Sequence, residues 1–286
     1  MATFVFFHAH PDDEAIGTAG TMAAAAHAGH RVVAVFATRG ERGDVPGDLA
    51  GHGTLGALRE AEAHAAGRIL GAARVAFLGY EDSGMLPEDV PDEGFAAADV
   101  DVAGARLAAL LAEEAADALV IYDPTGATKH PDHLQVHRVG CRAAELAGPG
   151  GPRVYEAVIA ASQLARLVRQ VTPEGAPDVE VGLFAVPDSE LTTVVEVGPW
   201  LATKRAAMAA HASQIPPDSW FLTLPDDQFA AIWGSESYVD RAAGHAGPGP
   251  LDAAVGDLAT AYRNGSPQKA HGDGTQPSGT QENGVD

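Results

Sequence analysis

The sequence predicts an α/β fold: a Rossmann-like, mostly parallel and twisted sheet with helices on both faces, followed by a smaller, irregular C-terminal part. Three observations lead to this prediction. Short apolar runs alternate with longer segments of helical periodicity. The runs are almost continuously apolar, as expected of strands that are covered on both faces. Each run ends in a loop rich in glycine, proline or charged residues, where such folds place their sites.

Strands and helices alternate over the first 161 residues. For example, Leu58, Ala61, Ala65 and Ile69 recur at helical spacing, and Gly71 provides a stop. Strands are expected at Phe4 to Phe7, His30 to Thr38, Arg74 to Leu78, Asp117 to Pro124 and Val154 to Ala160. Helices are expected at Ala15 to His27, Leu58 to Leu70, Val102 to Ala115 and Leu134 to Leu146.

The usual doubly wound order places the first and fourth strands side by side, where the winding reverses. The loops after these two strands should therefore meet in one crevice. Beyond residue 161 we expect a strand at Thr192 to Val197 and helices at Leu164 to Gln170, Trp200 to Ala212 and Asp226 to Trp233. We expect one domain over residues 1–262, with a core of about 1–161 and a substrate-side extension of about 162–262, and a disordered tail over 263–286.

The composition indicates a soluble, globular protein. With 18 basic and 39 acidic residues, the chain is not expected to bind nucleic acid or an anionic membrane surface. The sequence contains neither a membrane-spanning apolar run nor a basic leader, so we expect a cytoplasmic protein. The single cysteine, Cys141, is interpreted as a small core residue. The oligomeric state is not predicted.

The densest polar stretch, His10-Pro11-Asp12-Asp13-Glu14, directly follows the first strand. His10 and Asp13 could present one nitrogen and one oxygen to a metal, which would leave Asp12 free as a base. Acidic residues in a first helical turn also cap helices, so capping by Asp12 and Asp13 is the competing interpretation.

A second polar cluster, His130-Pro131-Asp132-His133, follows the fourth strand. With His10 and Asp13, His133 would complete a catalytic zinc site for one ion, with two nitrogens, one carboxylate and an open fourth position. Fe²⁺ or another divalent ion is an alternative. Asp12 would then be the general base, His130 would assist the oxyanion or the leaving amine, and Asp132 would orient an imidazole.

Other interpretations of these residues are weaker or stay open. His133 and His137 are four apart, but His137 should lie a turn deeper and is interpreted as structural, and His8 as a buried histidine. Gly17 and Gly20 come too late in the turn for a dinucleotide-binding motif. A non-haem Fe(II) enzyme with the same ligand set, or a sugar-binding protein that keeps the metal site without turnover, stays open.

Together, the two histidine motifs resemble those of the PIG-L/LmbE superfamily of zinc-dependent N-deacetylases. Similar segments elsewhere are Thr38-Arg39-Gly40-Glu41, Asp82-Ser83-Gly84-Met85 and His211-x-x-Gln214. The resemblance implies a hydrolase that cleaves a linear amide C–N bond to remove an N-acyl group, usually acetyl, from an amino sugar or glycoconjugate. By this resemblance His10, Asp13 and His133 bind zinc, Asp12 is the base, and His130 and Asp132 assist.

The resemblance is most marked with the mycothiol-pathway members. It implies that Arg59 and Asp82 contact the sugar. The chain departs from this branch at Thr128, where those enzymes usually carry a tyrosine. The phenol contact to the oxyanion is therefore missing or supplied elsewhere, which bears on the substrate rather than on the chemistry.

Overall fold

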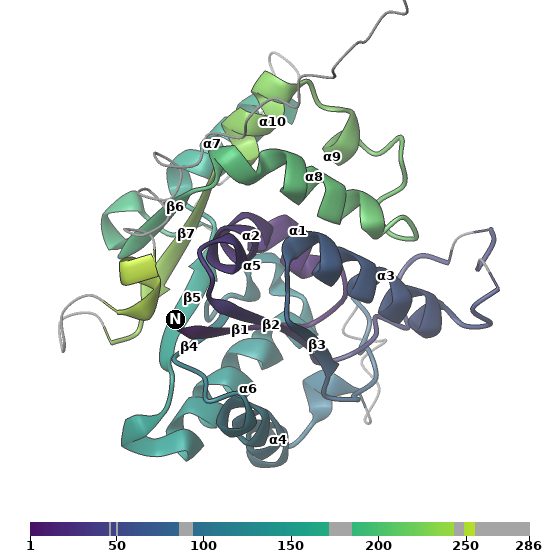
Figure 1. Cartoon of the computed structure of the whole chain (residues 1–286). Coiled ribbons are helices and arrows are strands. Elements are labelled where there is room, and N and C mark those ends of the chain that lie inside the picture. Colours follow the sequence, from purple (N-terminus) through teal and green to yellow (C-terminus); the bar gives the residue numbers. More distant parts are fainter. Residues whose placement is uncertain (46, 50, 86–93, 172–184, 243–248, 255–286) are drawn as a thin grey trace, which may run out of the picture.

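A seven-stranded sheet with the order β3-β2-β1-β4-β5-β7-β6 forms the centre of the protein (Figure 1). The structure is a computed structural model and describes residues 1–45, 47–49, 51–85, 94–171, 185–242 and 249–254. Strands β1 to β5 are parallel, whereas β7 is antiparallel to both β5 and β6. The strands are β1 (Thr3–His8), β2 (Arg31–Phe36), β3 (Arg74–Phe77), β4 (Ala118–Tyr122), β5 (Arg153–Val158), β6 (Thr193–Glu196) and β7 (Ser235–Asp240). The predicted α/β class and the pairing of the first and fourth strands are confirmed.

Helices cover both faces of the sheet (Figure 1). The alternation of β1 shows why: Phe4 and Phe6 pack in a cluster with α2 and α3, whereas Val5 and Phe7 pack with α4 and α6. The longer helices are α1 (Asp13–Gly17), α2 (Ala19–His27), α3 (Leu55–Leu70), α4 (Val100–Glu113), α6 (Pro131–Ala147), α7 (Ala161–Val171), α8 (Leu201–Ala210) and α10 (Asp226–Trp233). Short helices are α5 (Gly126–Lys129) and α9 (Trp220–Thr223).

Three details differ from the prediction. The helix expected over Ala15 to His27 is two helices, α1 and α2, which are separated at Thr18 with φ of −135°. Helix α6 begins at Pro131, so His133 lies in its first turn. Strand β7 was not predicted, and it joins the C-terminal part to the sheet. The tail over residues 263–286 lies outside the described residues.

The sequence was expected to lack a membrane-spanning segment, and the described helices can be compared with that expectation. None of them combines the length and the apolar character that crossing a bilayer requires.

Candidate active site and metal centre

The two histidine motifs meet at the carboxyl end of the parallel strands. His10 follows β1, and His130 and His133 begin α6 after β4, the neighbour of β1. The ring centroid of His10 lies 4.6 Å from that of His130 and 5.5 Å from that of His133. Residues about 120 apart in the sequence therefore share one cluster, as the strand order predicts.

The carboxylate of Asp13 lies between two imidazoles. Its Oδ2 is 3.5 Å from His10 Nδ1, and its Oδ1 is 3.4 Å from His133 Nε2. Two ligands that each lie about 2.0–2.1 Å from a tetrahedral zinc ion are about 3.4 Å apart. Each separation by itself suits a shared ion, but the two contacts use different oxygens of Asp13, so His10, Asp13 and His133 do not bring one donor atom each within 4.8 Å of one another.

The cluster holds more potential donors than these three. His10, His130 and His133 each offer a nitrogen within 4.8 Å of the others, and His10, Asp82 and Asp132 form a second such group. Asp132 Oδ1 is buried and lacks a hydrogen-bond partner within the described part of the chain. Burial lowers the pKa of His10, but Asp13, Asp132 and Asp82 outweigh this effect and raise it well above its usual value. The donors and the charge balance thus favour a cation at this position.

Main-chain and carboxylate groups orient the two metal-binding candidates. His133 Nδ1 donates to the Gly126 carbonyl at 3.1 Å, which leaves Nε2 free toward Asp13. Gly126 has φ of +64°, and a Cβ at this position would collide with His133. On the other side, Asp132 Oδ2 lies 3.1 Å from His10 Nε2 and accepts the Ser83 N–H at 3.0 Å. Asp132 therefore orients His10 rather than its neighbour in sequence, His130.

His130 is held as a neutral donor. Its Nδ1 accepts the main-chain N–H of Asp132 at 3.1 Å, so the proton of the neutral ring is on Nε2. Burial, followed by the neighbouring imidazoles of His10 and His133, lowers its pKa to about 4. An Nε2–H group in this setting can donate a hydrogen bond to a developing negative charge.

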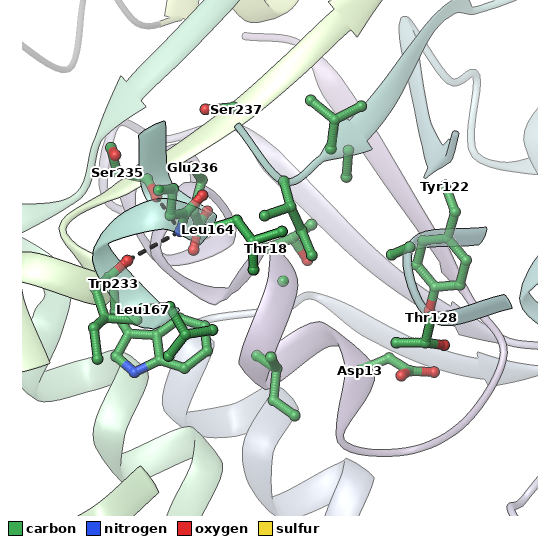
Figure 2. A pocket seen from close by; sticks show the side chains of 18 of the residues that line it. Asp13, Thr18, Tyr122, Thr128, Leu164, Leu167, Trp233, Ser235, Glu236 and Ser237 are labelled. Atoms are coloured by element: carbon green, nitrogen blue, oxygen red, sulfur yellow. Dashed lines mark hydrogen bonds between the residues drawn. The ribbon is translucent and has the colours of Figure 1, made fainter. Parts of the chain in front are cut away.

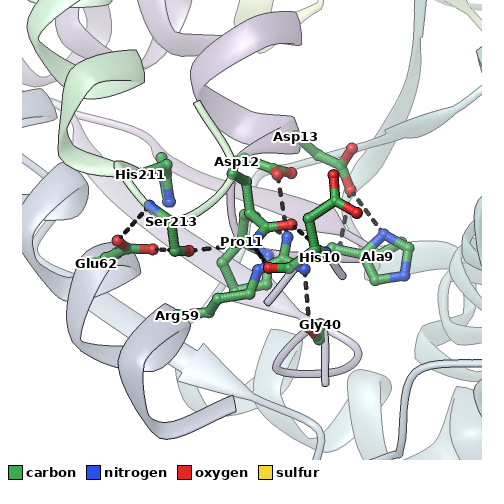
Figure 3. Close-up of polar contacts among 12 residues, drawn as sticks. Ala9, His10, Pro11, Asp12, Asp13, Gly40, Arg59, Glu62, His211 and Ser213 are labelled. Atoms are coloured by element: carbon green, nitrogen blue, oxygen red, sulfur yellow. Dashed lines mark hydrogen bonds and ion pairs between the residues drawn. The ribbon is translucent and has the colours of Figure 1, made fainter. Parts of the chain in front are cut away.

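Asp12 lies beside Arg59 in the site (Figure 3). Its backbone is strained, with φ of 113°. Its N–H donates to Glu14 Oε2 at 3.0 Å, and its carboxylate accepts from Arg59 Nη2 at 3.0 Å. Burial and the adjacent Asp13 raise the pKa of Asp12 to about 6, against the opposing effect of Arg59. Such a carboxylate is mostly ionised at neutral pH and basic enough to accept a proton from water. Strain of this kind is typical of functional positions.

Arg59 and Asp82 lie at the site but are engaged with protein groups. Arg59 donates to the carbonyls of Gly40 at 2.8 Å and Pro11 at 2.5 Å, in addition to Asp12. Asp82 accepts main-chain N–H groups from Gly84 and Arg42 and lies 3.4 Å from His10 Nε2. In this structure both residues position the site, and their contact with a sugar stays a prediction.

Three positioning residues, Glu14, His211 and Gln214, did not enter the predicted site. Glu14 Oε1 lies 2.6 Å from Nε2 of His211 at the end of α8, and both side chains are buried. Gln214 exchanges hydrogen bonds with the main chain of Asp44. The spacing of His211 and Gln214 was noted only by resemblance, and its position next to Glu14 depends on a contact across 197 residues.

The remaining candidates have structural roles, as expected. His8 lies 3.1 Å from the Tyr122 hydroxyl and 3.1 Å from the Thr18 hydroxyl. His137 Nδ1 lies 3.1 Å from the Tyr122 carbonyl, and its Nε2 is 3.7 Å from the Sγ of the half-buried Cys141. Burial raises the pKa of the Cys141 thiol, which disfavours a nucleophile.

The chain is similar in sequence to a known protein family and to several named proteins. The family model described as PIG-L, GlcNAc-PI de-N-acetylase, matches residues 5–144. The chain is 39% identical over 267 residues to a protein of Salinispora arenicola named 1D-myo-inositol 2-acetamido-2-deoxy-alpha-D-glucopyranoside deacetylase, with 85% of each chain covered. A protein of the same name from Kineococcus radiotolerans is 37% identical, and the alignment covers 75% of this chain and 69% of that one.

Solved structures show the same fold with more than one chemistry. The N,N'-diacetylchitobiose deacetylase of Pyrococcus horikoshii has a TM-score of 0.52 and 23% identity, with 76% of this chain and 72% of that chain covered. The 4-carboxy-2-hydroxymuconate hydratase of Pseudomonas putida has a TM-score of 0.52 and 21% identity, with 84% and 96% covered. Because a deacetylase and a hydratase share this architecture, the fold does not determine the reaction.

Proposed function

This chain belongs to the PIG-L family of deacetylases, and from that membership we propose that it is a zinc-dependent hydrolase that removes the acetyl group from the nitrogen of an amino sugar. The observation that carries the proposal is the position of Asp13 between His10 and His133, with Asp12 beside them. The names of the relatives favour an N-acetylglucosaminyl inositol as substrate. They do not support an iron oxygenase or a protein without turnover.

The metal site is proposed to consist of His10, Asp13 and His133. A zinc ion held by these residues would polarise the amide carbonyl and make water more acidic. Asp132 fixes the ring of His10, and the Gly126 carbonyl fixes the ring of His133. These contacts keep the donor atoms in place before the substrate binds.

The chain's own residues handle the protons. Asp12 accepts a proton from the water that attacks the amide carbon, for which a pKa of about 6 is suitable. The Nε2–H of His130 donates a hydrogen bond to the developing oxyanion. It thereby takes the place of the tyrosine hydroxyl that is missing here, since this chain has Thr128 at that position. When the C–N bond breaks, the proton held by Asp12 passes to the leaving nitrogen. The products are acetate and a free amine.

The direct test measures acetate released from 1D-myo-inositol 2-acetamido-2-deoxy-alpha-D-glucopyranoside by protein stripped with a chelator and reloaded with zinc. We expect release to fall to background on stripping and to return with about one equivalent of zinc. Release that does not depend on the metal would overturn the proposed zinc chemistry. If the zinc-loaded protein binds this glycoside and N-acetylglucosamine but releases acetate from neither, the protein is not a deacetylase of these sugars.

A further inference from the structure

An apolar cavity of about 220 Å³ adjoins the proposed metal site. Asp13, Tyr122 and Thr128 line one end of it, and Trp233, Leu167 and Glu236 lie at the other end (Figure 2). His133, whose Nδ1 is 3.1 Å from the Thr128 hydroxyl, also lines it. Between the two ends the walls are mostly apolar. They include Ile16, Val158, Ile159 and Leu164. The cavity is therefore continuous with two of the three proposed metal ligands.

The residues proposed to contact the attacking water, the oxyanion, the leaving nitrogen and the sugar do not line this cavity. Asp12, His130, Arg59 and Asp82 are absent from its described lining. At an amide carbon, the acyl substituent and the nitrogen point in different directions. If the oxyanion lies toward His130 and the nitrogen with its sugar lies toward Asp12, the acyl substituent points past Asp13 and His133 into the cavity.

The far end of the cavity holds a charge pair that is already satisfied. Lys204 Nζ donates to Glu236 Oε1 at 2.5 Å, and both side chains are buried. Glu236 also accepts the main-chain N–H groups of Gly20 and Thr21 at 2.9 and 2.8 Å. Because these charges are paired, the cavity favours an uncharged apolar group over a charged one.

The cavity is larger than an acetyl group requires. On the same measure one water molecule requires about 10–15 Å³, and the cavity measures about 220 Å³, so it has room for several groups beyond the methyl of an acetyl group. Thr128, which is exposed, lines the cavity next to His133, with its hydroxyl 3.1 Å from His133 Nδ1. We propose that the cavity is an acyl-binding site, and that the enzyme accepts N-acyl amino sugars with linear apolar acyl groups of about four to six carbons in preference to acetyl. This inference rests on the proposed function.

The test compares N-acetyl-, N-butanoyl- and N-hexanoylglucosamine as substrates of the zinc-loaded protein. The product is glucosamine in each case, so one amine assay serves all three. Burial of a methylene favours binding by about threefold to fourfold, so kcat/KM should rise about tenfold from acetyl to butanoyl. Turnover of the acetyl compound with kcat/KM falling at each added carbon would overturn the acyl-site proposal and leave the proposed function intact. Turnover of none of the three would overturn the acyl-site proposal, and absence of acetate release from the inositol glycoside as well would overturn the proposed function.

Variants of α7 locate the effect. Leu164→Trp fills the cavity and should lower kcat/KM for the hexanoyl compound at least tenfold while leaving that for the acetyl compound within about twofold. Arg169→Trp is the matched control, because Arg169 is exposed on the same helix and does not line the cavity. Equal loss for both substrates in Leu164→Trp would count against the proposal.

A binding measurement provides a readout that does not depend on turnover or on the folding of a cavity variant. Calorimetry with the Asp12→Asn protein should give a dissociation constant at least tenfold lower for N-hexanoylglucosamine than for N-acetylglucosamine. Equal constants for the two sugars would contradict an acyl site.

Discussion

Replacing Asp12 separates its proposed role as a base from the strain in its backbone. Asp12 has φ of 113°, and its carboxylate contacts Arg59 but is not one of the proposed metal ligands. Asp12→Asn removes the charge and keeps a Cβ in the strained conformation. Asp12→Gly removes both. Both variants lose the ion pair with Arg59, but Asn keeps a side-chain oxygen that can accept from Arg59 and Gly does not, so the difference between their stabilities is a lower bound on the strain in the backbone.

The magnitudes follow from the geometry. A residue other than glycine in a sparsely populated backbone region costs about 1–3 kcal/mol, and glycine gives back about 0.5–1 kcal/mol through its freedom in the unfolded chain. Asp12→Gly should therefore be more stable than Asp12→Asn by about 1 kcal/mol, which is about 2 °C in Tm for a chain of this size. Both variants should lose about 10²–10⁴ in kcat, since general base catalysis contributes about that factor.

The assays are urea unfolding of the metal-free proteins and acetate release by the zinc-loaded ones. Ala115→Gly is the control, because Ala115 also has a positive φ, of 48°, but lies after α4 and outside the site. It should gain stability without a change in kcat. Two results would refute the reasoning: an Asp12→Asn protein that retains full kcat, or an Asp12→Gly protein less stable than Asp12→Asn.

Two further predictions concern the metal and the pH dependence of stability. Asp13→Ala should reduce bound zinc from about one equivalent to a small fraction, measured by mass spectrometry. His137→Ala, the control, should keep its zinc. Retention of zinc by Asp13→Ala would exclude Asp13 as a ligand. Glu114 accepts hydrogen bonds from Arg31 and Arg74, which lower its pKa, so Glu114→Gln should cost about 1 kcal/mol at pH 7. Because the folded pKa is below the unfolded one, this stabilisation is present above about pH 4.5 and is lost as the pH falls through the folded value. A difference in urea unfolding that stays constant down to pH 3 would contradict this account.

The parallel part of the sheet was predictable because its strands carry strong apolar signals. Val32 to Phe36 and Leu119 to Ile121 are buried on both faces, and a buried strand has to be apolar throughout. Strand β7 lacks this signal. It contains Glu236, whose burial depends on Lys204 and on the N–H groups of α2. Such partners are distant in sequence, so the strand could not be recognised locally.

The same limit applies to the site. The meeting of His10 with His133 follows from the order of the strands, which the sequence pattern indicates. Which carboxylate orients which imidazole depends on side-chain directions. Asp132 was expected to orient an imidazole, and spacing alone did not predict that this would be His10 rather than His130. Arg59 likewise required the structure, because its guanidinium is directed at the strained turn around Asp12.

The two parts of the chain contribute differently to the proposed activity. The proposed metal ligands, the base and His130 all lie within residues 5–144, which the family model matches. The apolar walls beyond Ile16 come mainly from β5, α7 and the segment around α10 and β7, which lie outside that range. Changes in the later part can therefore alter the shape of the cavity without displacing the donor atoms. Because β7 pairs with β5 in the same sheet, these later elements are joined directly to the part that carries the site, and under the acyl-site proposal they would set the length of the acyl group independently of the hydrolytic chemistry.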